Sequence, residues 1–188
     1  MTAGEPRPWT GIYDSFYPQQ TRARDILERH SRSVADLALE INRRKGIGLP
    51  EAEVELAAML HDIGIFLTDA PSIGCFGSRP YLLHGVLGAD LLRRHGFDEA
   101  VARVAERHTG SGITAEEIAS WHMPFPAGRV LCPQSDLEQL VCYADKFYSK
   151  SGDMRRKPLD RVRASLARFG TGSLARFESL HARFSTDS

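Results

Sequence analysis

The residues best suited to chemistry in this 188-residue sequence are His61 and Asp62, where an apolar helical run beginning near Glu53 ends before Gly64. At helical spacing the imidazole shares a face with apolar residues, so His61 is expected to point toward the core. The residues on this face are Val54, Ala57, Ala58 and His61. An ionised carboxylate beside a buried imidazole is unfavourable unless something pairs with both groups. A divalent metal ion is one such partner.

Four further segments each carry a metal-capable side chain on or beside an apolar helical face: His30, His84, His108 and Asp145. Taken singly, a histidine on such a face is more often a hydrogen-bonded core residue than a ligand. Four histidines and two aspartates that all point inward cannot easily neutralise one another, whereas a bound cation can. Imidazole and carboxylate together favour iron, manganese, zinc, cobalt or nickel over calcium. The six side chains suffice for two divalent ions that share Asp62.

The elements that must position these residues are helices. Apolar periodicity and capping residues predict helices over 21–45, 50–62, 81–95, 98–109, 114–122, 135–150 and 157–184, the last interrupted at Gly170 and Gly172. We expect residues 68–80 to form an irregular loop over the site. We also expect Gly88 to allow another backbone segment to approach closely. No segment shows the alternation of a strand, so the predicted class is all-α, a helical bundle with the metal site among its core helices.

The predicted organisation has three parts. Residues 1–19 are rich in proline and aromatic residues and predict an extended arm packed on the body. We expect an N-terminal arm at 1–20, a metal-binding helical domain at 21–150, and a C-terminal helical extension at 151–188 packed on that domain. From Lys150 onward nine basic residues stand against four acidic ones. Because apolar residues are interspersed among them, an amphipathic helix with a solvated basic face is favoured over a polyphosphate or nucleic-acid site.

The composition limits the kinds of binding partner that are expected. Twenty-four basic residues balance twenty-four acidic ones, so no overall charge favours nucleic acid or a membrane surface. No apolar run approaches the ~20 residues that span a bilayer, and the N-terminus lacks the apolar core of a secretory signal. A cytoplasmic protein without membrane or nucleic-acid partners is expected, with the oligomeric state left open. The three cysteines are widely spaced and are expected to be reduced.

The order of these motifs resembles a known family, the HD-domain metal-dependent phosphohydrolases, and the letters LHDIG at 60–64 are similar to its HDIG subgroup. The similarity covers roughly 30–150. The segments around His84 and His108 resemble the five-region variants with a dinuclear centre, including bacterial hydrolases that split diadenosine tetraphosphate symmetrically. The resemblance implies an all-α fold with one metal at His30, His61, Asp62 and Asp145. It implies a second metal at Asp62, His84 and His108, with Asp62 as the bridge.

One departure from the family concerns the residue after Gly64. Many HDIG proteins have lysine there, but this sequence has Ile65, so a lysine that could contact a phosphate is missing at that place. The glycine-tyrosine-proline signature of cyclic-di-GMP enzymes is also missing. The candidate phosphate contacts are Lys146, Arg107, Thr109 and Arg79. A solvated or salt-bridged face explains the charged ones equally well, and a helix end explains the glycines that follow Thr109.

These observations predict a hydrolase. Two metal ions ~3.5–4 Å apart would turn a bridging water into a hydroxide that attacks phosphorus, with His61 and Asp62 at the centre of catalysis. The expected substrate is a nucleotide or another small phosphorylated metabolite, cleaved at a phosphoester or phosphoanhydride bond. The alternative is a metal-containing domain that binds or senses a nucleotide without turning it over. Complete ligands favour the enzyme, and the missing lysine favours the sensor.

Overall fold

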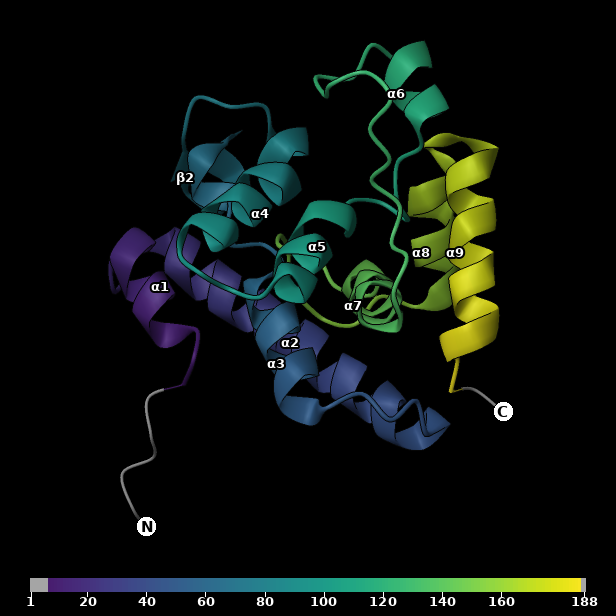
Figure 1. Cartoon of the computed structure of the whole chain (residues 1–188), viewed down its shortest axis with the longest axis horizontal. Helices are drawn as coiled ribbons and strands as arrows, with labels where there is room; N and C mark the ends of the chain where they lie inside the picture. The colour runs from purple at the N-terminus through teal and green to yellow at the C-terminus, as the bar shows by residue number, and fades with distance from the viewer. Residues whose placement is uncertain (1–6, 187–188) are drawn as a thin grey trace.

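The computed structural model describes residues 7–186, and these residues form a helical bundle with very little sheet (Figure 1). The all-α prediction is therefore confirmed. No described helix is long and apolar enough to cross a bilayer. The α-helices are α1 (Thr10–Phe16), α2 (Arg22–Lys45), α3 (Glu51–Leu60), α4 (His84–Arg94), α5 (Glu99–Arg107), α6 (Ala115–Ser120), α7 (Asp136–Lys146), α8 (Leu159–Ala167) and α9 (Gly170–Phe184).

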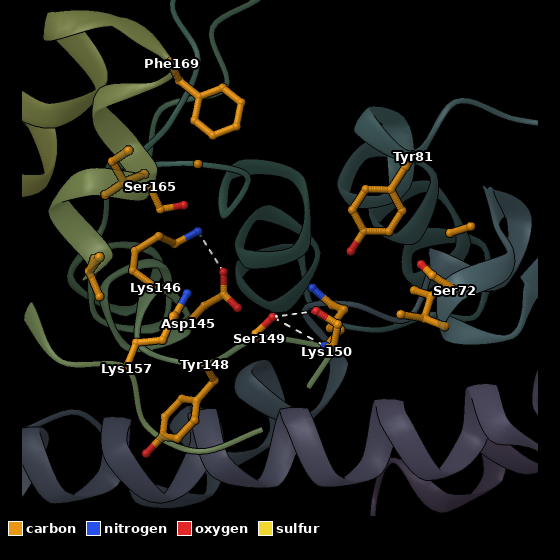
Figure 2. A pocket seen from close by; sticks show the side chains of 16 residues that line it. Ser72, Tyr81, Asp145, Lys146, Tyr148, Ser149, Lys150, Lys157, Ser165 and Phe169 are labelled. Atoms are coloured by element: carbon orange, nitrogen blue, oxygen red, sulfur yellow. Dashed lines mark hydrogen bonds and ion pairs between the residues drawn. The ribbon is translucent and has the colours of Figure 1, made fainter. Parts of the chain in front are cut away.

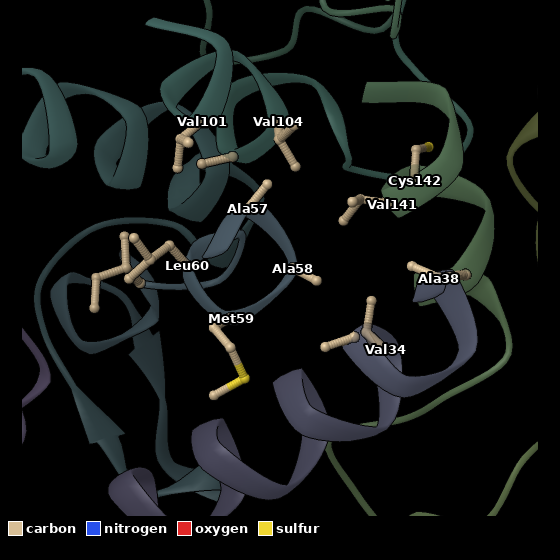
Figure 3. Close-up of a cluster of buried hydrophobic side chains, with 14 of the residues drawn as sticks. Val34, Ala38, Ala57, Ala58, Met59, Leu60, Val101, Val104, Val141 and Cys142 are labelled. Atoms are coloured by element: carbon tan, nitrogen blue, oxygen red, sulfur yellow. The ribbon is translucent and has the colours of Figure 1, made fainter. Parts of the chain in front are cut away.

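Helices α2, α3, α5 and α7 enclose the main core (Figure 3). Their facing positions are dominated by alanine and valine, as at Ala38, Ala57, Ala58 and Val141, all fully buried. Small side chains let the helix axes approach closely, so residues projecting from different helices can meet in the middle. This close packing brings the ligand candidates of separate helices within reach of one another.

The N-terminal arm contains a helix that the sequence did not predict. Helix α1 occupies seven residues of the segment expected to be extended, so that expectation is wrong there, and residues 1–6 of the arm lie outside the described residues. The Tyr17 hydroxyl donates to the Ile63 carbonyl at 2.7 Å, and the Tyr13 hydroxyl donates to the Met59 carbonyl. The arm therefore packs on the body as expected, and its tyrosines hold the backbone on both sides of His61 and Asp62.

The segment after Asp62 is tightly packed and is held by contacts between residues that are close in the sequence. Two-residue strands β1 (Asp69–Ala70) and β2 (Cys75–Phe76) pair antiparallel, so the predicted irregular loop contains a small hairpin that no alternation revealed. The 3-10 turn Pro71–Ile73 connects the two strands, and the 3-10 turns Ile65–Leu67 and Tyr81–Leu83 lie before and after the hairpin. A Cβ on Gly64 would lie 2.5 Å from the Gly88 nitrogen and would also clash with the His84 carbonyl. The predicted close approach at Gly88 is confirmed, and its partner is Gly64.

Capping residues start the helices where the sequence predicted. Asp98 and Ser135 accept hydrogen bonds from the first turns of α5 and α7, and Thr114 and Glu117 form a complete capping box on α6. The predicted interruption at Gly170 separates α8 from α9, because Gly170 begins α9 with a φ of 88°.

The C-terminal extension folds as an antiparallel pair of helices against α7 (Figure 1). Phe177 and Phe184 of α9 are buried against Tyr143 of α7, with ring centroids 5.8 and 5.7 Å from the tyrosine ring. The Arg176 guanidinium donates to Glu117 of α6 and to the Gly112 carbonyl. The extension therefore contacts both the core and the loop region around α6.

Candidate metal centre

His61 and Asp62 lie at the carboxyl end of α3 and are completely buried. The helix delivers His61 to the core because Val54, Ala57 and Ala58, on the same face, are themselves fully buried. Asp62 follows in the turn that leads to Gly64. The hydrogen bonds of Tyr13 and Tyr17 to backbone carbonyls fix this turn. The His61 and Asp62 side chains are therefore held by an anchored, buried backbone and not by an exposed loop.

The six residues singled out by the sequence lie together in two groups. His30, His61, Asp62 and Asp145 present ligand atoms that all lie within 4.8 Å of one another, and so do Asp62, His84 and His108. All six residues are buried, and they come from α2, the end of α3, α4, the end of α5 and α7. Asp62 belongs to both groups because one oxygen faces each of them: Oδ2 lies 3.2 Å from His30, and Oδ1 lies 3.3 Å from His84 and from His108.

Three of the imidazoles are oriented by the same backbone device. The Nδ1 atoms of His61, His84 and His108 donate to the carbonyl three residues earlier, at 2.6, 2.7 and 2.8 Å. A carbonyl can only accept, so Nδ1 carries a proton and Nε2 is the ring nitrogen that faces the cluster. This is the tautomer that metal-binding histidines need, with the second nitrogen held by a backbone acceptor.

The converging lone pairs need a positive charge between them. His84 Nε2 and His108 Nε2 are 2.9 Å apart. Burial lowers the pKa of His108 to about 3. The effect of burial is larger than the opposing effect of the hydrogen bond with Asp62, so this ring is neutral. Asp62 is surrounded at short distances, with His61 Nε2 3.0 Å from Oδ2, but within the described residues neither atom of this pair has a well-directed hydrogen bond. Six buried nitrogen and oxygen ligands that converge in this way fit a divalent metal site well.

Charge inside the cluster is balanced among its own groups. Burial alone would lower the pKa of His61, but the carboxylates of Asp62 and Asp145 raise it to about 9. Burial would raise the pKa of Asp62, yet the charges of His61 and Lys150 hold it well below its usual range. Asp145 is held low against its burial in the same way, chiefly by Lys146. The His61 proton and the two lysine ammonium groups therefore neutralise the charge of the carboxylates, as bound metal ions would.

Lys150 is the residue of this site that sequence reasoning missed. Its Nζ lies 2.6 Å from Asp62 Oδ2, and its side chain is only 14% exposed. The predicted solvated basic face is wrong for this residue. The available signal was its position five residues after Asp145, just beyond α7, where the chain can turn back over the ligands. Burial would lower the pKa of Lys150, but Asp62 raises it above the ordinary value, so the side chain is an ammonium.

A basic cavity of about 380 Å³ opens beside Asp145 (Figure 2). Lys146, Lys150 and Lys157 line it together with several hydroxyl groups, and Tyr81 and Phe169 stand on opposite sides. Ala70, Ser72 and Ile73 also line it, so the 68–80 segment forms part of its wall as expected. Three lysines beside the proposed ligands give an anionic group a place to bind.

The four candidate phosphate contacts divide between the site and other surroundings. Lys146 lines the basic cavity, where its Nζ donates to the His108 carbonyl at 2.8 Å, and Thr109 lines a neighbouring apolar cavity. Arg107 instead donates to the buried Glu138 at 3.0 Å and lines neither cavity. Arg79 is exposed at the end of the hairpin and also lines neither.

Comparisons with known proteins identify the family and the fold. The family model described as HD domain matches residues 27–149, a stretch that holds all six ligand candidates. The HD domain of the L. monocytogenes phosphodiesterase PgpH shares the fold, with a TM-score of 0.54 and 17% identity over 95% of this chain and 88% of that chain.

Two curated relatives differ in what their names say. A tRNA (cytidine(56)-2'-O)-methyltransferase of Thermoplasma volcanium is 34% identical over 177 residues, which are 94% of this chain and 46% of that protein. An uncharacterised protein of Methanocaldococcus jannaschii is 35% identical over 121 residues, 63% of each chain. The chain thus spans about half to two thirds of the length of these relatives.

Proposed function

Because the chain belongs to the HD-domain family, we propose that it is a metal-dependent phosphohydrolase, which cleaves a phosphoester or phosphoanhydride bond of a small phosphorylated molecule. The observation that carries this proposal is the pair of Nε2 atoms of His84 and His108, which lie 2.9 Å apart and each 3.3 Å from Asp62 Oδ1. Nothing but a shared proton or a cation stabilises such a pair. Six ligands in two groups provide for two divalent transition-metal ions, of which iron, manganese, cobalt, nickel and zinc suit the donor set.

Each metal would have its own ligands. His30, His61, Asp62 and Asp145 would hold one ion, and Asp62, His84 and His108 would hold the other, with Asp62 shared. Divalent ions bound here would supply Lewis-acid activation of water near neutral pH and would neutralise charge on the phosphoryl oxygens. The backbone-anchored imidazoles keep the ligand geometry ready, which limits reorganisation during the reaction.

The lysines of the basic cavity would bind the phosphate. Lys150 reaches Asp62 and also lies 5.9 Å from the centroid of the Tyr81 ring, so it borders both the ligands and the cavity opening. We propose that Lys150 provides the phosphate-binding cation that the sequence lacks at Ile65, which is buried in the core. In the overall reaction, a water oxygen bonds to phosphorus, the bond from phosphorus to the leaving oxygen breaks, and a proton passes to that oxygen. Lys146 and Lys157 would hold the non-reacting phosphoryl oxygens.

The names of the relatives do not change this reaction class. The methyltransferase name belongs to a protein of which the matched part is 46%, whereas the site described above is a set of imidazoles and carboxylates. A nucleotide remains the proposed substrate class. If the protein acts on tRNA, the group that it cleaves would belong to a nucleotide or to the end of an RNA chain. The second candidate is a domain that binds a nucleotide at the metal centre without turnover.

Phosphate release distinguishes the two candidates. Purified protein would be incubated with Mn, Fe, Co, Ni or Zn and with nucleotides, dinucleotides and glycerol phosphate. We expect metal-dependent release of phosphate or of a nucleotide product from at least one of them. Asp62→Asn should abolish it while the helical circular-dichroism signal persists. Tight nucleotide binding without turnover under every metal would support the binding domain instead.

A further inference from the structure

A second cavity, of about 280 Å³, opens next to the basic one and has the opposite character. It is lined by the aromatic rings of Tyr81, Trp121 and Phe169 and by aliphatic side chains such as Ile113 and Met123. Within the described residues, five large hydrophobic side chains are substantially exposed, and these three aromatics are among them. Exposed aromatic surface gathered at one opening indicates a binding site rather than chance exposure.

The apolar cavity is continuous with the metal centre. It shares Tyr81, Gly110 and Phe169 with the basic cavity, and His84 lies in its own wall. The Tyr81 ring stacks on the His84 imidazole with centroids 4.7 Å apart and planes at 21°. A molecule whose phosphate lies among the lysines can therefore extend past Tyr81 into the apolar cavity.

Parts of the chain outside the matched family stretch build the far wall. Phe169 precedes α9, and the Trp121 indole lies against the next residue, with Cζ2 3.6 Å from the place of a Cβ on Gly170. The half-buried ion pair of Arg176 with Glu117, at 2.8 Å, joins α9 to α6 and so holds Phe169 near Trp121. The C-terminal extension, beyond the matched residues 27–149, thus contributes Phe169, Ser173 and Arg176 to the wall of this cavity.

We propose that this apolar cavity is the base subsite of the enzyme, which binds the aromatic base of a nucleoside phosphate against Trp121 and Phe169. This inference rests on the proposed function, because it assumes that the phosphate lies in the basic cavity. A flat base suits the site better than an alkyl chain for two reasons. The walls are aromatic, which favours stacking on any base, and the Thr109 hydroxyl in the lining offers a polar group to a base edge.

Tryptophan fluorescence can report on this subsite directly. The chain has two tryptophans, so Trp9→Phe leaves Trp121 as the single emitter. The metal-loaded protein would be titrated on ice with the four ribonucleoside 5′-triphosphates, with inorganic tripolyphosphate, and with dodecyl phosphate. We expect at least one nucleotide to quench the emission and to bind more tightly than tripolyphosphate, which carries the phosphates without a base.

Variants separate stacking from folding. Loss of one base–aromatic contact weakens binding by about 5-fold to 150-fold, so Trp121→Leu and Phe169→Leu, measured by calorimetry, should each raise the nucleotide Kd by that factor. Their Kd for tripolyphosphate should stay unchanged. Trp121→Phe should retain most of the affinity. Phe76→Leu is the matched control, because Phe76 is an aromatic residue, 80% exposed, that lines neither cavity.

Three results would overturn the base subsite: nucleotides that bind no more tightly than tripolyphosphate, nucleotide affinity unchanged in both leucine variants, or preferential binding of dodecyl phosphate. Failure of the hydrolase proposal looks different, because it is the absence of metal-dependent phosphate release from every substrate, glycerol phosphate and tripolyphosphate included. The base subsite can therefore be rejected while hydrolysis stands.

Discussion

Replacing Lys150 with methionine tests how the buried carboxylate of Asp62 is neutralised. Without metal, the Lys150 ammonium lies 2.6 Å from Asp62 Oδ2 in a largely buried pair. Removing one partner of a buried ion pair destabilises a protein by about 3–5 kcal/mol, because the other charge stays buried without compensation. His61, whose pKa is raised to about 9, still faces Asp62 at 3.0 Å and compensates part of the loss. We therefore expect about 3 kcal/mol.

The expected change is large enough for calorimetry. For a chain of this size, 1 kcal/mol shifts the Tm by about 2–4 °C, so Lys150→Met should lower the Tm of the chelated protein by about 6–12 °C. With saturating Mn²⁺ the ion replaces the ammonium as the partner of Asp62, and the Tm difference should shrink to a small fraction of that value. By linkage, the variant should bind metal more tightly than the wild type, with each 1.4 kcal/mol of difference worth a factor of ten.

A matched control comes from the same cavity. Lys157 also lines it, and the described residues give its ammonium no ion pair within 4.0 Å. Lys157→Met should change the Tm little in either state. Equal destabilisation of the chelated and the Mn²⁺-loaded Lys150→Met protein, or none in the chelated protein, would refute the idea that Lys150 and metal compensate the same carboxylate.

Three further variants test the positioning of the ligands. Gly64→Ala places a methyl group 2.5 Å from the Gly88 nitrogen and should lower the free energy of unfolding by at least 1–3 kcal/mol in urea. Gly11→Ala, in helix α1 with open space around it, should leave the stability unchanged or raise it slightly; equal losses in both variants would contradict the close approach. Tyr17→Phe leaves the buried Ile63 carbonyl without its donor and should cost about 1–3 kcal/mol by the same measurement; an unchanged midpoint would show that the arm does not hold the turn. His84→Ala should reduce the bound metal from two ions toward one by elemental analysis, and two ions retained would remove His84 from the ligand set.

The sequence predicted the ligand cluster because its geometry follows from helix periodicity. A histidine that continues an apolar helical face must point toward the core. This rule alone predicts that His30, His61, His84 and His108 are buried, as they are in the structure. Capping chemistry likewise placed the starts of α5, α6 and α7, since side-chain oxygens and first-turn N–H groups are local partners.

What the sequence did not predict depends on contacts between distant segments. Helix α1 is stabilised by burying Tyr13 and Tyr17 against the turn after α3, 46 residues away, which no local pattern encodes. The hairpin of β1 and β2 is too short to show alternation. In the sequence Lys150 resembles the surface lysines, and it is the fold after α7 that brings it to Asp62. Phe169 and Trp121 line one cavity because the Arg176–Glu117 ion pair joins α9 to α6.

The most direct test of the whole account is a crystal structure of the protein with Mn²⁺, with anomalous diffraction recorded at the metal edge. The account predicts two anomalous peaks per chain, one among His30, His61, Asp62 and Asp145 and one among Asp62, His84 and His108, with Asp62 between them. No peak at these six residues under saturating metal, with the imidazoles and carboxylates joined only by hydrogen bonds to one another, would contradict the metal centre and the hydrolase built on it.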